Sequence, residues 1–548
     1  MAFTIEVTNG PVFSSDVPVT GKSVLSESLP DGEEKNIVAW RVNNYLRSLD
    51  WVIEDNARVE FIDTSSFEGM EVYRRSLSFL LVLACKRGLA KDIVLRHSIS
   101  EGYYWEFVEG AVSDGDLAVI KTTMDDLVGK DLPFIRKVVP LDKARRIFDR
   151  QGSGEVARLF QWGAVDPVEL YRCADMYGYY YAPLAPSTAY LKLYDLKKLG
   201  PGMVLQFPTI SYPSSLPPFR ASKNLSGVFL DYAKWLEVLD LRTMDSLHKK
   251  VAEGKTQEVI LISEAFHAQK LGRIADEIAS RSKVKVAAIA GPSGSGKTTF
   301  SERLKIQLLV CGRNPVTLAM DNYFVNREDT PRDEDGNLDF EVVEALELEL
   351  LQEHLRRLLA GEEVVTPQFN FIEGKKKPGK KMKLGPRDIL IMEGIHGLND
   401  RVTGALPKDE MYGIFVSPLT GVNFDNHNRT STTDNRLLRR LVRDARTRGH
   451  SAEATLTMWP KVIRGSMHFV FPYQKHADVM FNSSLPYELS ALRAYVDPIL
   501  HTVPESSPVY GEAQRILSMI KFVPMVPTEI IPNNSIIREF IGGSCFDV

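Results

Sequence analysis

The second half of the chain alternates short apolar runs with amphipathic stretches. Five of these runs end at a glycine or a polar residue, and they span 284–290, 316–320, 389–392, 414–416 and 479–481. Strands that alternate with helices in this way indicate a doubly wound α/β domain with a mostly parallel sheet. Ligands of such domains gather beyond the carboxyl ends of the strands, so the residues that follow these runs are candidates for a functional site.

The first half has a different pattern, in which apolar and polar residues alternate over short stretches. Residues 1–65 predict short strands with one helix, and the stretches concerned are Phe3–Val7, Ile37–Trp40 with the following Val42–Leu49, and Ala57–Ile62. Farther along, helical spacing of apolar residues predicts a helix over Glu71–Arg87, and Gly102–Phe107 predicts an aromatic-rich strand. These patterns favour two successive α+β modules.

The stretch Phe207–Phe219, with prolines at 208, 213, 217 and 218 and Pro201 just before it, predicts a loop that closes the second module, and helical spacing resumes over 228–282. The chain therefore divides into five predicted segments. They are 1–65, 66–225, a helical connector at 226–283, the α/β domain at 284–490 and a C-terminal extension at 491–548, whose pattern predicts nothing specific.

Composition narrows the class of protein. With 548 residues and 44% hydrophobic content, the chain can bury more than one core. The 67 basic and 71 acidic residues give a net charge of −4, so no overall positive field attracts nucleic acid or membrane. The four cysteines lie far apart, and no apolar run reaches the roughly 18 residues of a membrane span. We therefore expect a soluble, cytoplasmic protein without membrane contact.

The strongest motif is Gly291-Pro-Ser-Gly-Ser-Gly-Lys297-Thr298, which fits the pattern GxxxxGK[ST] between an apolar strand and a helix. Its glycines let successive backbone N–H groups face one anion, Lys297 can reach the β- and γ-phosphates, and the hydroxyl of Thr298 can bind Mg²⁺. A P-loop NTPase domain that uses ATP and Mg²⁺ is therefore predicted. The predicted nucleotide-binding residues are Gly291, Ser293, Gly294, Ser295, Gly296, Lys297, Thr298 and Thr299.

Two carboxylates follow predicted strands of the same sheet. Asp321 could accept the proton of an attacking hydroxyl or contact the metal through water, and its alternative role is to cap the following turn. Glu393 occupies the place of a Walker B carboxylate, so we expect it to bind magnesium together with Thr298. The nearby His396 is interpreted as a packed loop residue.

Basic residues gather in two places. Arg436, Arg439, Arg440 and Arg443 recur at helical spacing behind Asp434, which we expect to cap their helix. Guanidinium groups that point one way could compensate charge on a transferring phosphoryl group, and a solvated arginine face is the alternative. The second cluster, Lys375–Lys383, fits a turn that closes over anions and a solvated hairpin tip equally well, and we assign it no catalytic role.

The order of these landmarks resembles the uridine kinase and phosphoribulokinase family. The landmarks are GPSGSGKTT, MDNYF, FNF at Phe369–Phe371, MEGIHGL, DNRLLRRLVRDARTRGH and KHADVMFN. The resemblance covers about residues 284–485 and implies a P-loop kinase. It also implies that Asp321 is the general base and that Arg436, Arg440 and Arg443 form a lid over the triphosphate, with Lys297 completing the catalytic set.

One segment departs from the pattern of this family. Uridine kinases hold the base through a tyrosine and a histidine in a YDFxxH-like segment, whereas Phe369 and Gly374 stand at those positions here. The resemblance still makes a nucleoside the leading acceptor. Another hydroxyl acceptor, such as a sugar phosphate or a small metabolite, is the alternative that this departure favours.

The first half resembles two other families. Val38–Asn44 through Ala57–Ile62 resembles the TGS domain, a β-grasp module, and Gly69–Leu81 with Ile99–Phe107 resembles the second additional domain of threonyl-tRNA synthetases, which edits mischarged tRNA. That domain carries HxxxH and a later CxxxH, at which this chain has Arg74, Ser78, Cys173 and Tyr177. Because these positions lack imidazoles, we expect no zinc site and no editing.

Other roles for these aromatic and sulfur side chains are simpler. Cys173 is interpreted as a small buried hydrophobe. The tyrosines at 177, 179, 180 and 181 could stack on a base, but the pattern favours a half-buried aromatic strand.

Together these features predict an ATP- and Mg²⁺-dependent kinase that transfers the γ-phosphoryl group to a small hydroxyl acceptor, foremost a nucleoside at its 5′ position. The alternative from another class is a nucleotide-gated regulatory protein whose N-terminal half contacts tRNA. The sequence is compatible with a homo-oligomer. It does not specify the acceptor, the donor base or the role of the N-terminal modules.

Overall fold

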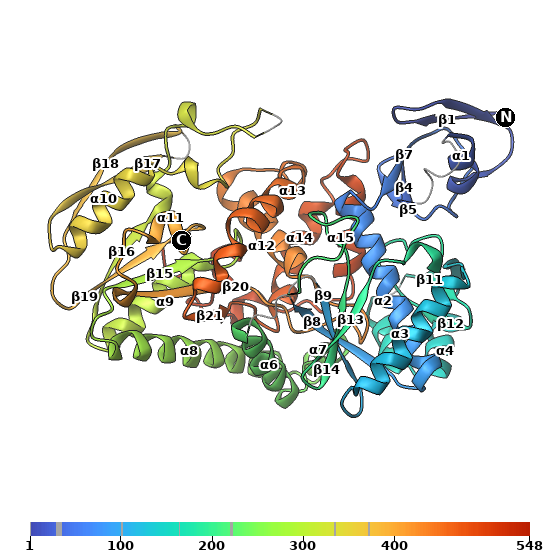
Figure 1. The fold of residues 1–548 in the computed structure, drawn as a ribbon, viewed down its shortest axis with the longest axis horizontal. Helices are drawn as coiled ribbons and strands as arrows, with labels where there is room; N and C mark the ends of the chain where they lie inside the picture. Colours follow the sequence, from blue (N-terminus) through green and yellow to red (C-terminus); the bar gives the residue numbers. More distant parts are fainter. Residues whose placement is uncertain are drawn as a thin grey trace. The chain divides into compact units, whose positions relative to one another are not determined.

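A computed structural model describes residues 2–28, 36–99, 102–163, 165–219, 223–333, 336–370 and 373–547 (Figure 1). Three residues of the motifs above, Ser100, Glu101 and Phe371, lie outside these ranges. The chain forms two compact units: unit 1 comprises 1–253, 421–430 and 500–525, and unit 2 comprises 254–420, 431–499 and 526–548. Since this division cuts across the order of the chain, the five predicted segments remain predictions.

Unit 1 begins with a five-stranded mixed sheet in the order β2-β1-β7-β4-β5. Its elements, with a small extra pair β3 and β6, are β1 (Phe3–Val7), β2 (Val12–Ser15), β3 (Val19–Thr20), α1 (Gly21–Ser28), β4 (Ile37–Val42), β5 (Tyr45–Arg47), β6 (Val52–Ile53) and β7 (Ala57–Asp63). The predicted strands are confirmed, because alternate residues such as Ile5 and Val59 are buried around Trp40. The helix of this region is α1, and β5 occupies the stretch after β4.

The rest of unit 1 is built around α2 (Phe67–Leu89), which is buried on most of its surface. Ser66 caps its first turn by accepting a hydrogen bond from the N–H of Gly69, and Ala90 ends it in a left-handed conformation. Two antiparallel sheets, in the orders β13-β14-β9-β8 and β10-β11-β12, accompany it. Their strands are β8 (Ile93–Ile99), β9 (Gly102–Phe107), β10 (Ile135–Val139), β11 (Val168–Cys173), β12 (Met176–Gly178), β13 (Asp195–Leu199) and β14 (Gly202–Gln206).

Further helices complete unit 1, and they come from distant parts of the chain. They are α3 (Asp114–Gly129), α4 (Leu141–Gln151), α5 (Gly154–Gly163), α6 (Lys223–Val238), α7 (Met244–Ala252) and α15 (Tyr510–Ile520). The proline-rich stretch before α6 is a loop over its described residues, as expected. Gly163 lies so close to Lys521 that a Cβ on it would be 2.3 Å from the carbonyl oxygen of Lys521, so the segment after α15 is packed into unit 1.

Unit 2 contains one five-stranded sheet in the order β16-β19-β15-β20-β21, and every neighbouring pair is parallel. The strands are β15 (Val286–Ala290), β16 (Asn314–Ala319), β19 (Asp388–Glu393), β20 (Met411–Ser417) and β21 (Val479–Asn482). All five predicted strands are thus confirmed, because buried apolar runs between helices are typical of parallel strands. The central strand β15 is buried throughout.

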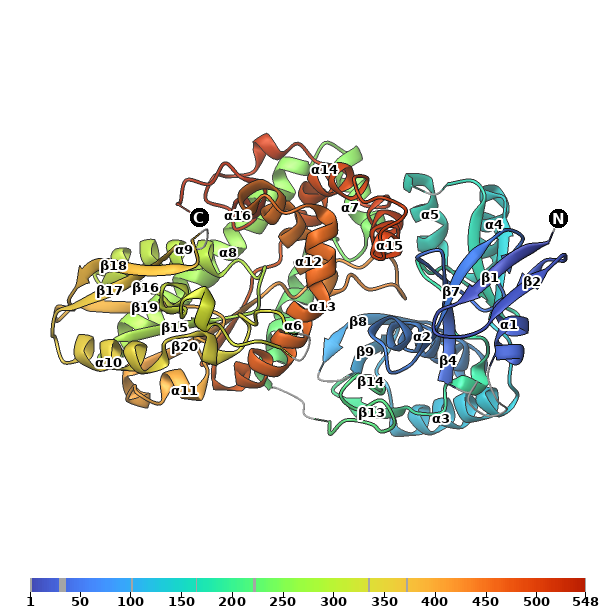
Figure 2. The ribbon, with the colours of Figure 1, turned by 90° about the horizontal axis from the view of Figure 1, so that it is seen from above.

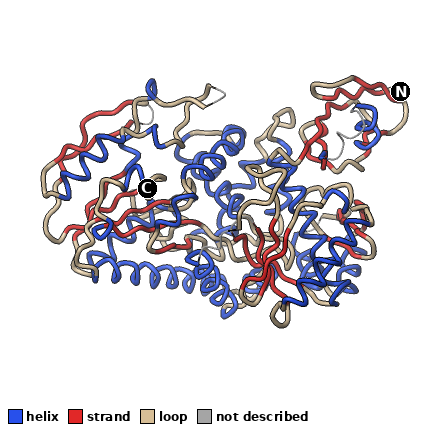
Figure 3. The backbone as a smooth tube through the Cα atoms, viewed as in Figure 1, coloured by secondary structure: helices blue, strands red, loops and turns tan. Residues whose placement is uncertain are grey.

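Helices surround this sheet, and Figure 2 gives a second view of them. They are α8 (Thr256–Ser280), α9 (Lys297–Val310), α10 (Leu348–Leu359), α11 (Asp400–Thr403), α12 (Thr432–Arg443), α13 (Ala452–Phe469), α14 (Glu488–Leu500) and α16 (Arg538–Ile541). Figure 3 shows α8, which confirms the helical pattern predicted there, as one long helix. Among the described residues, no helix has the length and apolar character needed to cross a bilayer.

A two-stranded hairpin, β17 (Val364–Asn370) and β18 (Lys375–Met382), lies outside the main sheet. It packs against the short helix η3 (Met320–Tyr323) that follows β16. The lysines of Lys375–Lys383 therefore run along a strand, and the prediction that they form a turn or a hairpin tip is wrong. Lys376 forms an ion pair with Glu347.

Candidate active site

The loop from Gly291 to Gly296 connects β15 to α9. Gly294 and Gly296 have φ values of 76° and 82°, in the left-handed region that favours glycine. A Cβ on Gly291 would lie 2.1 Å from the carbonyl oxygen of Val416, so this position also requires glycine. The loop ends at the first turn of α9, where unpaired N–H groups and the helix dipole favour an anion. This geometry fits the phosphate-binding role predicted from the motif.

The residues that follow these glycines lie in different environments. Lys297 is 9% exposed, and its Nζ donates a hydrogen bond to the carbonyl oxygen of Pro292 at 3.4 Å, so its ammonium group lies over the loop. Ser295 is fully buried, and its carbonyl accepts a hydrogen bond of 2.5 Å from Ser483. Thr298 is half-buried, whereas Thr299 is fully buried. The loop is thus held from β21 and from the start of α9.

Asp321 lies in η3 directly after β16, and Glu393 ends the neighbouring strand β19, since Ala319 of β16 pairs with Glu393. Burial raises the pKa of Glu393 to about 7; Lys297 opposes this shift, and Asp321 and Glu539 add to it. Asp321 reaches solvent, yet desolvation by the surrounding protein raises its pKa, while Lys297, Arg448 and Arg443 act in the opposite direction. The two carboxylates and Lys297 therefore share one electrostatic environment at the carboxyl edge of the sheet.

This set of oxygen ligands can be tested against Mg²⁺. Magnesium sites in kinases use one or two carboxylates, a hydroxyl and the phosphates of the substrate. Thr298, Asp321 and Glu393 supply such oxygens, and the mutual repulsion of the carboxylates is what a divalent cation would relieve. The residues present therefore fit the metal, with Glu393 and Thr298 as the residues expected to hold it.

Helix α12 carries the arginine cluster, but its cap differs from the prediction. Ser431 is the N-cap, and its hydroxyl accepts hydrogen bonds from the N–H groups of Thr433 and Asp434. The prediction that Asp434 caps the helix is wrong, because the helix starts one turn earlier and Asp434 lies in its first turn. A carboxylate in this position still complements the helix dipole.

Arg436, Arg439 and Arg440 of α12 are buried and Arg443 is half-buried, so the alternative of a solvated face is wrong. Arg436 is 2% exposed, its Nε donates to the carbonyl of Ser293 at 2.9 Å, and burial lowers its pKa to about 9. Arg439 is fully buried and forms an ion pair with Glu488. Arg440 donates to the hydroxyl of Ser293 at 3.1 Å. Helix α12 thus holds the phosphate-binding loop directly.

The next turn is a π-helix, η7 (Asp444–Arg448), and it carries the remaining arginines. Arg440 and Arg443 form ion pairs with Asp444 at 3.0 and 2.9 Å, and Arg448 lies 3.7 Å from the same carboxylate. Burial would raise the pKa of Asp444, but these three arginines lower it. The positive charges of Arg443 and Arg448 also lower the pKa of Asp321, so these two arginines interact electrostatically with the candidate base.

Sequence reasoning missed two residues of this site. Arg448 follows the helical run and was not included in the lid. Glu539 belongs to the C-terminal segment, whose pattern predicted nothing, and its carboxylate accepts a hydrogen bond of 3.1 Å from the N–H of Thr299. No local signal could have placed Glu539, since it is 240 residues away from Thr299 in the chain.

The segment that reads the base in uridine kinases is packed differently here. Phe369 is 7% exposed and lies edge-on to Phe324 at 5.9 Å between ring centroids. Its N–H donates to the side chain of Asn322, the residue after Asp321. Gly374 has a φ of 68°, and a Cβ there would lie 2.7 Å from the side chain of Arg327. His396 is buried, as interpreted.

In unit 1, the positions that resemble an editing site have other roles. Arg74 forms an ion pair of 2.8 Å with Glu71, and the hydroxyl of Ser78 donates to the carbonyl of Arg74. Cys173 is fully buried, which raises its pKa to about 11. Over the described residues, no group of three or more histidine, cysteine, aspartate or glutamate side chains could hold a metal ion.

Comparisons with known proteins agree with this geometry. The family model for the phosphoribulokinase / uridine kinase family matches residues 286–489. A uridine kinase from Halobacterium salinarum is 29% identical over 194 residues, which are 35% of this chain and 77% of that protein. A uridine kinase from Brevibacillus brevis is 30% identical over 195 residues, which are 35% of this chain and 81% of that protein.

The N-terminal region is similar to other proteins. A threonine–tRNA ligase from Azoarcus sp. is 32% identical over 199 residues, 36% of this chain, and the chain spans only 31% of the ligase. The kinase match is more complete, since it covers most of the related kinases and includes the loop and both carboxylates. Through unit 2, this chain belongs to the phosphoribulokinase / uridine kinase family of kinases.

Proposed function

We propose that unit 2 transfers the γ-phosphoryl group of ATP to the 5′-hydroxyl of a nucleoside. The observation that carries this proposal is the meeting of Lys297, Asp321 and Glu393 at the carboxyl edge of the parallel sheet. Similarity to uridine kinases supports a nucleoside as the acceptor.

Each residue has a role that follows from its position. Asp321 accepts the proton of the acceptor hydroxyl, and Lys297 compensates charge on the β- and γ-phosphates. Arg443 and Arg448 stabilise the charge that develops on the transferring group, because their positive charges lie close enough to Asp321 to lower its pKa. Thr298 and Glu393 would hold Mg²⁺, which when bound would neutralise charge between the terminal phosphates.

Arg436 and Arg440 contribute in a different way from the lid role predicted for them. Arg436 donates to the carbonyl of Ser293 and Arg440 to its hydroxyl, so both fix the loop that holds the phosphates. Binding of an anion to the loop would also stabilise the buried charge of Arg436, whose pKa burial lowers.

The residues of the hairpin next to η3 favour a second class of acceptor. Phe369 and Gly374 provide neither the hydroxyl nor the imidazole that uridine kinases use to hold the base, which favours a sugar phosphate or another small hydroxyl compound. For unit 1, similarity to threonine–tRNA ligases supports contact with tRNA as a proposal.

The experiment is a panel of nucleosides, sugars and sugar phosphates incubated with the full chain, ATP and Mg²⁺, with ADP release measured by a coupled assay. Phosphorylation of uridine or cytidine well above the acceptor-free rate is expected. Silence on every nucleoside with activity on another acceptor would overturn the nucleoside assignment. ADP release that no acceptor stimulates would favour a nucleotide-gated regulatory protein.

A further inference from the structure

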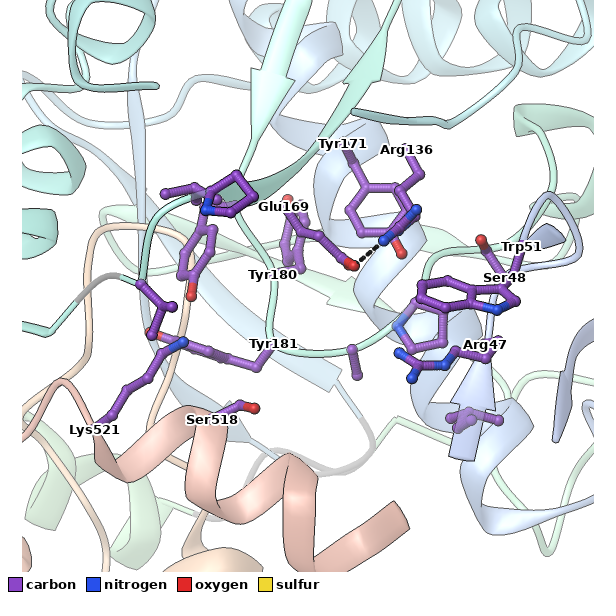
Figure 4. A pocket seen from close by; sticks show the side chains of 17 residues that line it. Arg47, Ser48, Trp51, Arg136, Glu169, Tyr171, Tyr180, Tyr181, Ser518 and Lys521 are labelled. Atoms are coloured by element: carbon purple, nitrogen blue, oxygen red, sulfur yellow. Dashed lines mark hydrogen bonds and ion pairs between the residues drawn. The ribbon is translucent and has the colours of Figure 1, made fainter. Parts of the chain in front are cut away.

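Unit 1 contains a cavity of about 250 Å³ (Figure 4). Four segments line it: residues 46–51 around β5, Arg136 of β10, residues within 165–183 around β11, and Ser518 with Lys521 at the end of α15. Figure 4 shows Arg47, Trp51 and Arg136 on one side and Lys521 with Ser518 on the other. A cavity closed by segments this far apart in sequence exists only in the folded unit.

The charges around this cavity do not balance. Its lining includes the cations Arg47, Arg136 and Lys521, and one carboxylate, Glu169, which is ion-paired with Arg136. Burial lowers the pKa of Arg47 and of Lys521, and Glu169 is the carboxylate that opposes this shift in both. Cations that are desolvated without enough acidic partners are stabilised by a bound anion.

Aromatic rings form much of the remaining wall. The guanidinium carbons of Arg47 and Arg136 lie 3.9 and 4.3 Å from the centroid of the Trp51 ring, which holds both cations in place. Tyr171 and Tyr179–Tyr181 line the cavity as well. Such faces favour a planar ring in the ligand.

Among the described residues of the lining, buried polar atoms without a hydrogen-bond partner include the hydroxyl oxygen of Tyr181 and Nε of Arg136. Buried polar atoms are normally satisfied, and leaving one unpaired costs about 1–3 kcal/mol. Both residues line the same cavity, so one polar ligand could satisfy both atoms.

We infer that this cavity binds a nucleoside monophosphate, with its phosphate at Arg47 and Arg136 and its base against the tyrosines near Lys521. Nucleoside monophosphates combine the required anion with a planar ring and have the size of a small metabolite. The inference goes beyond the phosphorylation proposed for unit 2 and does not depend on it, since it rests on the lining of unit 1 alone.

Isothermal titration calorimetry of the full chain with AMP, which is not the product expected from uridine or cytidine, tests this inference. We expect one binding event that survives Lys297→Ala in unit 2 and weakens about tenfold or more in Arg47→Gln and in Lys521→Gln. Arg58→Gln, at an exposed position of the same unit, is the matched control and should bind as the unaltered chain does. Thermal melts show whether each variant is folded.

Two further ligands and one further variant sharpen the result. Adenosine and inorganic phosphate should each bind more weakly than AMP, and Tyr181→Phe should weaken AMP binding without lowering stability, because it removes an unpaired hydroxyl. Equal AMP affinity in Arg47→Gln and Arg58→Gln would overturn the inference. Binding of an RNA strand ending in adenosine, with no binding of AMP, would overturn it in favour of an RNA end.

A second, independent observation concerns the C-terminal segment of unit 2. Glu539 is 8% exposed, accepts the hydrogen bond from the Thr299 N–H at the start of α9, and its own carbonyl accepts one of 3.0 Å from Arg446. Beside it, Ile536 is so close to Gly296 that a Cβ there would lie 2.6 Å from its side chain. A carboxylate thus already accepts a hydrogen bond from an N–H group in the first turn of the phosphate-binding helix.

We infer that Glu539 takes the place of a phosphate group, so that ATP must displace residues around 535–542 to bind. This inference rests on the proposed function of unit 2. Glu539→Gln removes the competing charge and should lower the Kd of a non-hydrolysable ATP analogue about fivefold to tenfold, measured by calorimetry without acceptor. Glu529→Gln, at an exposed position of the same segment, is the control.

The outcomes separate this inference from the kinase proposal, because binding is measured without phosphoryl transfer. An unchanged or higher Kd in Glu539→Gln would overturn the inference even if the enzyme phosphorylates nucleosides. If the analogue binds neither variant nor the unaltered chain, the nucleotide-binding role of unit 2 itself is wrong.

Discussion

Buried arginines of unit 2 have acidic partners, whereas the half-buried cations around the cavity of unit 1 outnumber its carboxylate. In unit 2, Arg439 pairs with Glu488 and Arg303 pairs with Glu264, with all four side chains less than 10% exposed. In unit 1, Glu169 is the one carboxylate among the cavity residues that include Arg47, Arg136 and Lys521. A buried charge with its own partner is part of the fold, whereas an excess of one sign marks a place for a ligand.

Arg436 shows that the same rule applies inside unit 2. It is buried against carbonyl and hydroxyl oxygens next to the phosphate-binding loop, and burial lowers its pKa to about 9. The arginine helix therefore contains both kinds of residue one turn apart. Helical spacing alone grouped them as one face.

The largest expected effect is a loss of phosphoryl transfer by unit 2 that leaves ligand binding by unit 1 unchanged. Asp321→Asn should lower kcat by about 10²–10⁴-fold, because the base that accepts the acceptor proton is lost. ATP binding and the AMP site of unit 1 should remain as they are. Asp329→Asn, at an exposed position on the same stretch, is the control, and equal turnover of the two variants would remove Asp321 from its role.

The next largest effect is a loss of stability when a buried ion pair of unit 2 is broken. Arg439→Met leaves Glu488 buried without its partner, so unit 2 should lose about 3–5 kcal/mol of stability in chemical denaturation. Arg357→Gln breaks an exposed pair with Glu353 and should change little. If both variants unfold at the same denaturant concentration, the Arg439 pair has no structural role.

A smaller effect is expected from the arginines close to Asp321. Arg443→Gln and Arg448→Gln should each lower kcat by about 10- to 100-fold, with a smaller change in ATP affinity, because their charge acts on the transferring group. Arg464→Gln, at an exposed position of α13, should retain the normal kcat. Loss of ATP affinity with normal kcat would assign these arginines to ground-state binding.

The smallest expected effect is a loss of stability at low pH, and it concerns one buried histidine in each unit. Burial lowers the pKa of His267 in unit 2 to about 3 and that of His97 in unit 1 to about 4. The unfolded chain takes up these protons near pH 6.5 and the folded chain does not, so each histidine removes stability as the pH falls below 6.5.

The expected slope is about 1.4 kcal/mol per pH unit for each histidine between pH 6 and pH 5. Denaturation curves of His97→Gln and His267→Gln at both pH values check it, and His501→Gln, at an exposed position, is the control. Slopes that match the unaltered chain would show that these imidazoles do not resist protonation.

The local elements of unit 2 could be predicted from the sequence because they depend on neighbours in the chain. The strands β15, β16, β19, β20 and β21 are apolar runs between helices, and the loop at Gly291–Gly296 needs its glycines for its own backbone. Asp321 and Glu393 could be placed by the same argument, since each follows a strand of one parallel sheet. Even the helix cap was missed by only one turn.

Partners that lie far apart in the chain were decided by the tertiary structure alone. Helical spacing put Arg436, Arg439 and Arg440 on α12, but only packing against Ser293 and Glu488 showed that they are buried and hold the loop. The same holds for Glu539 at Thr299 and for the cavity of unit 1, whose lining comes from four separate segments. A sequence pattern reports which residues an element presents, whereas burial and charge balance depend on what the rest of the chain brings against it.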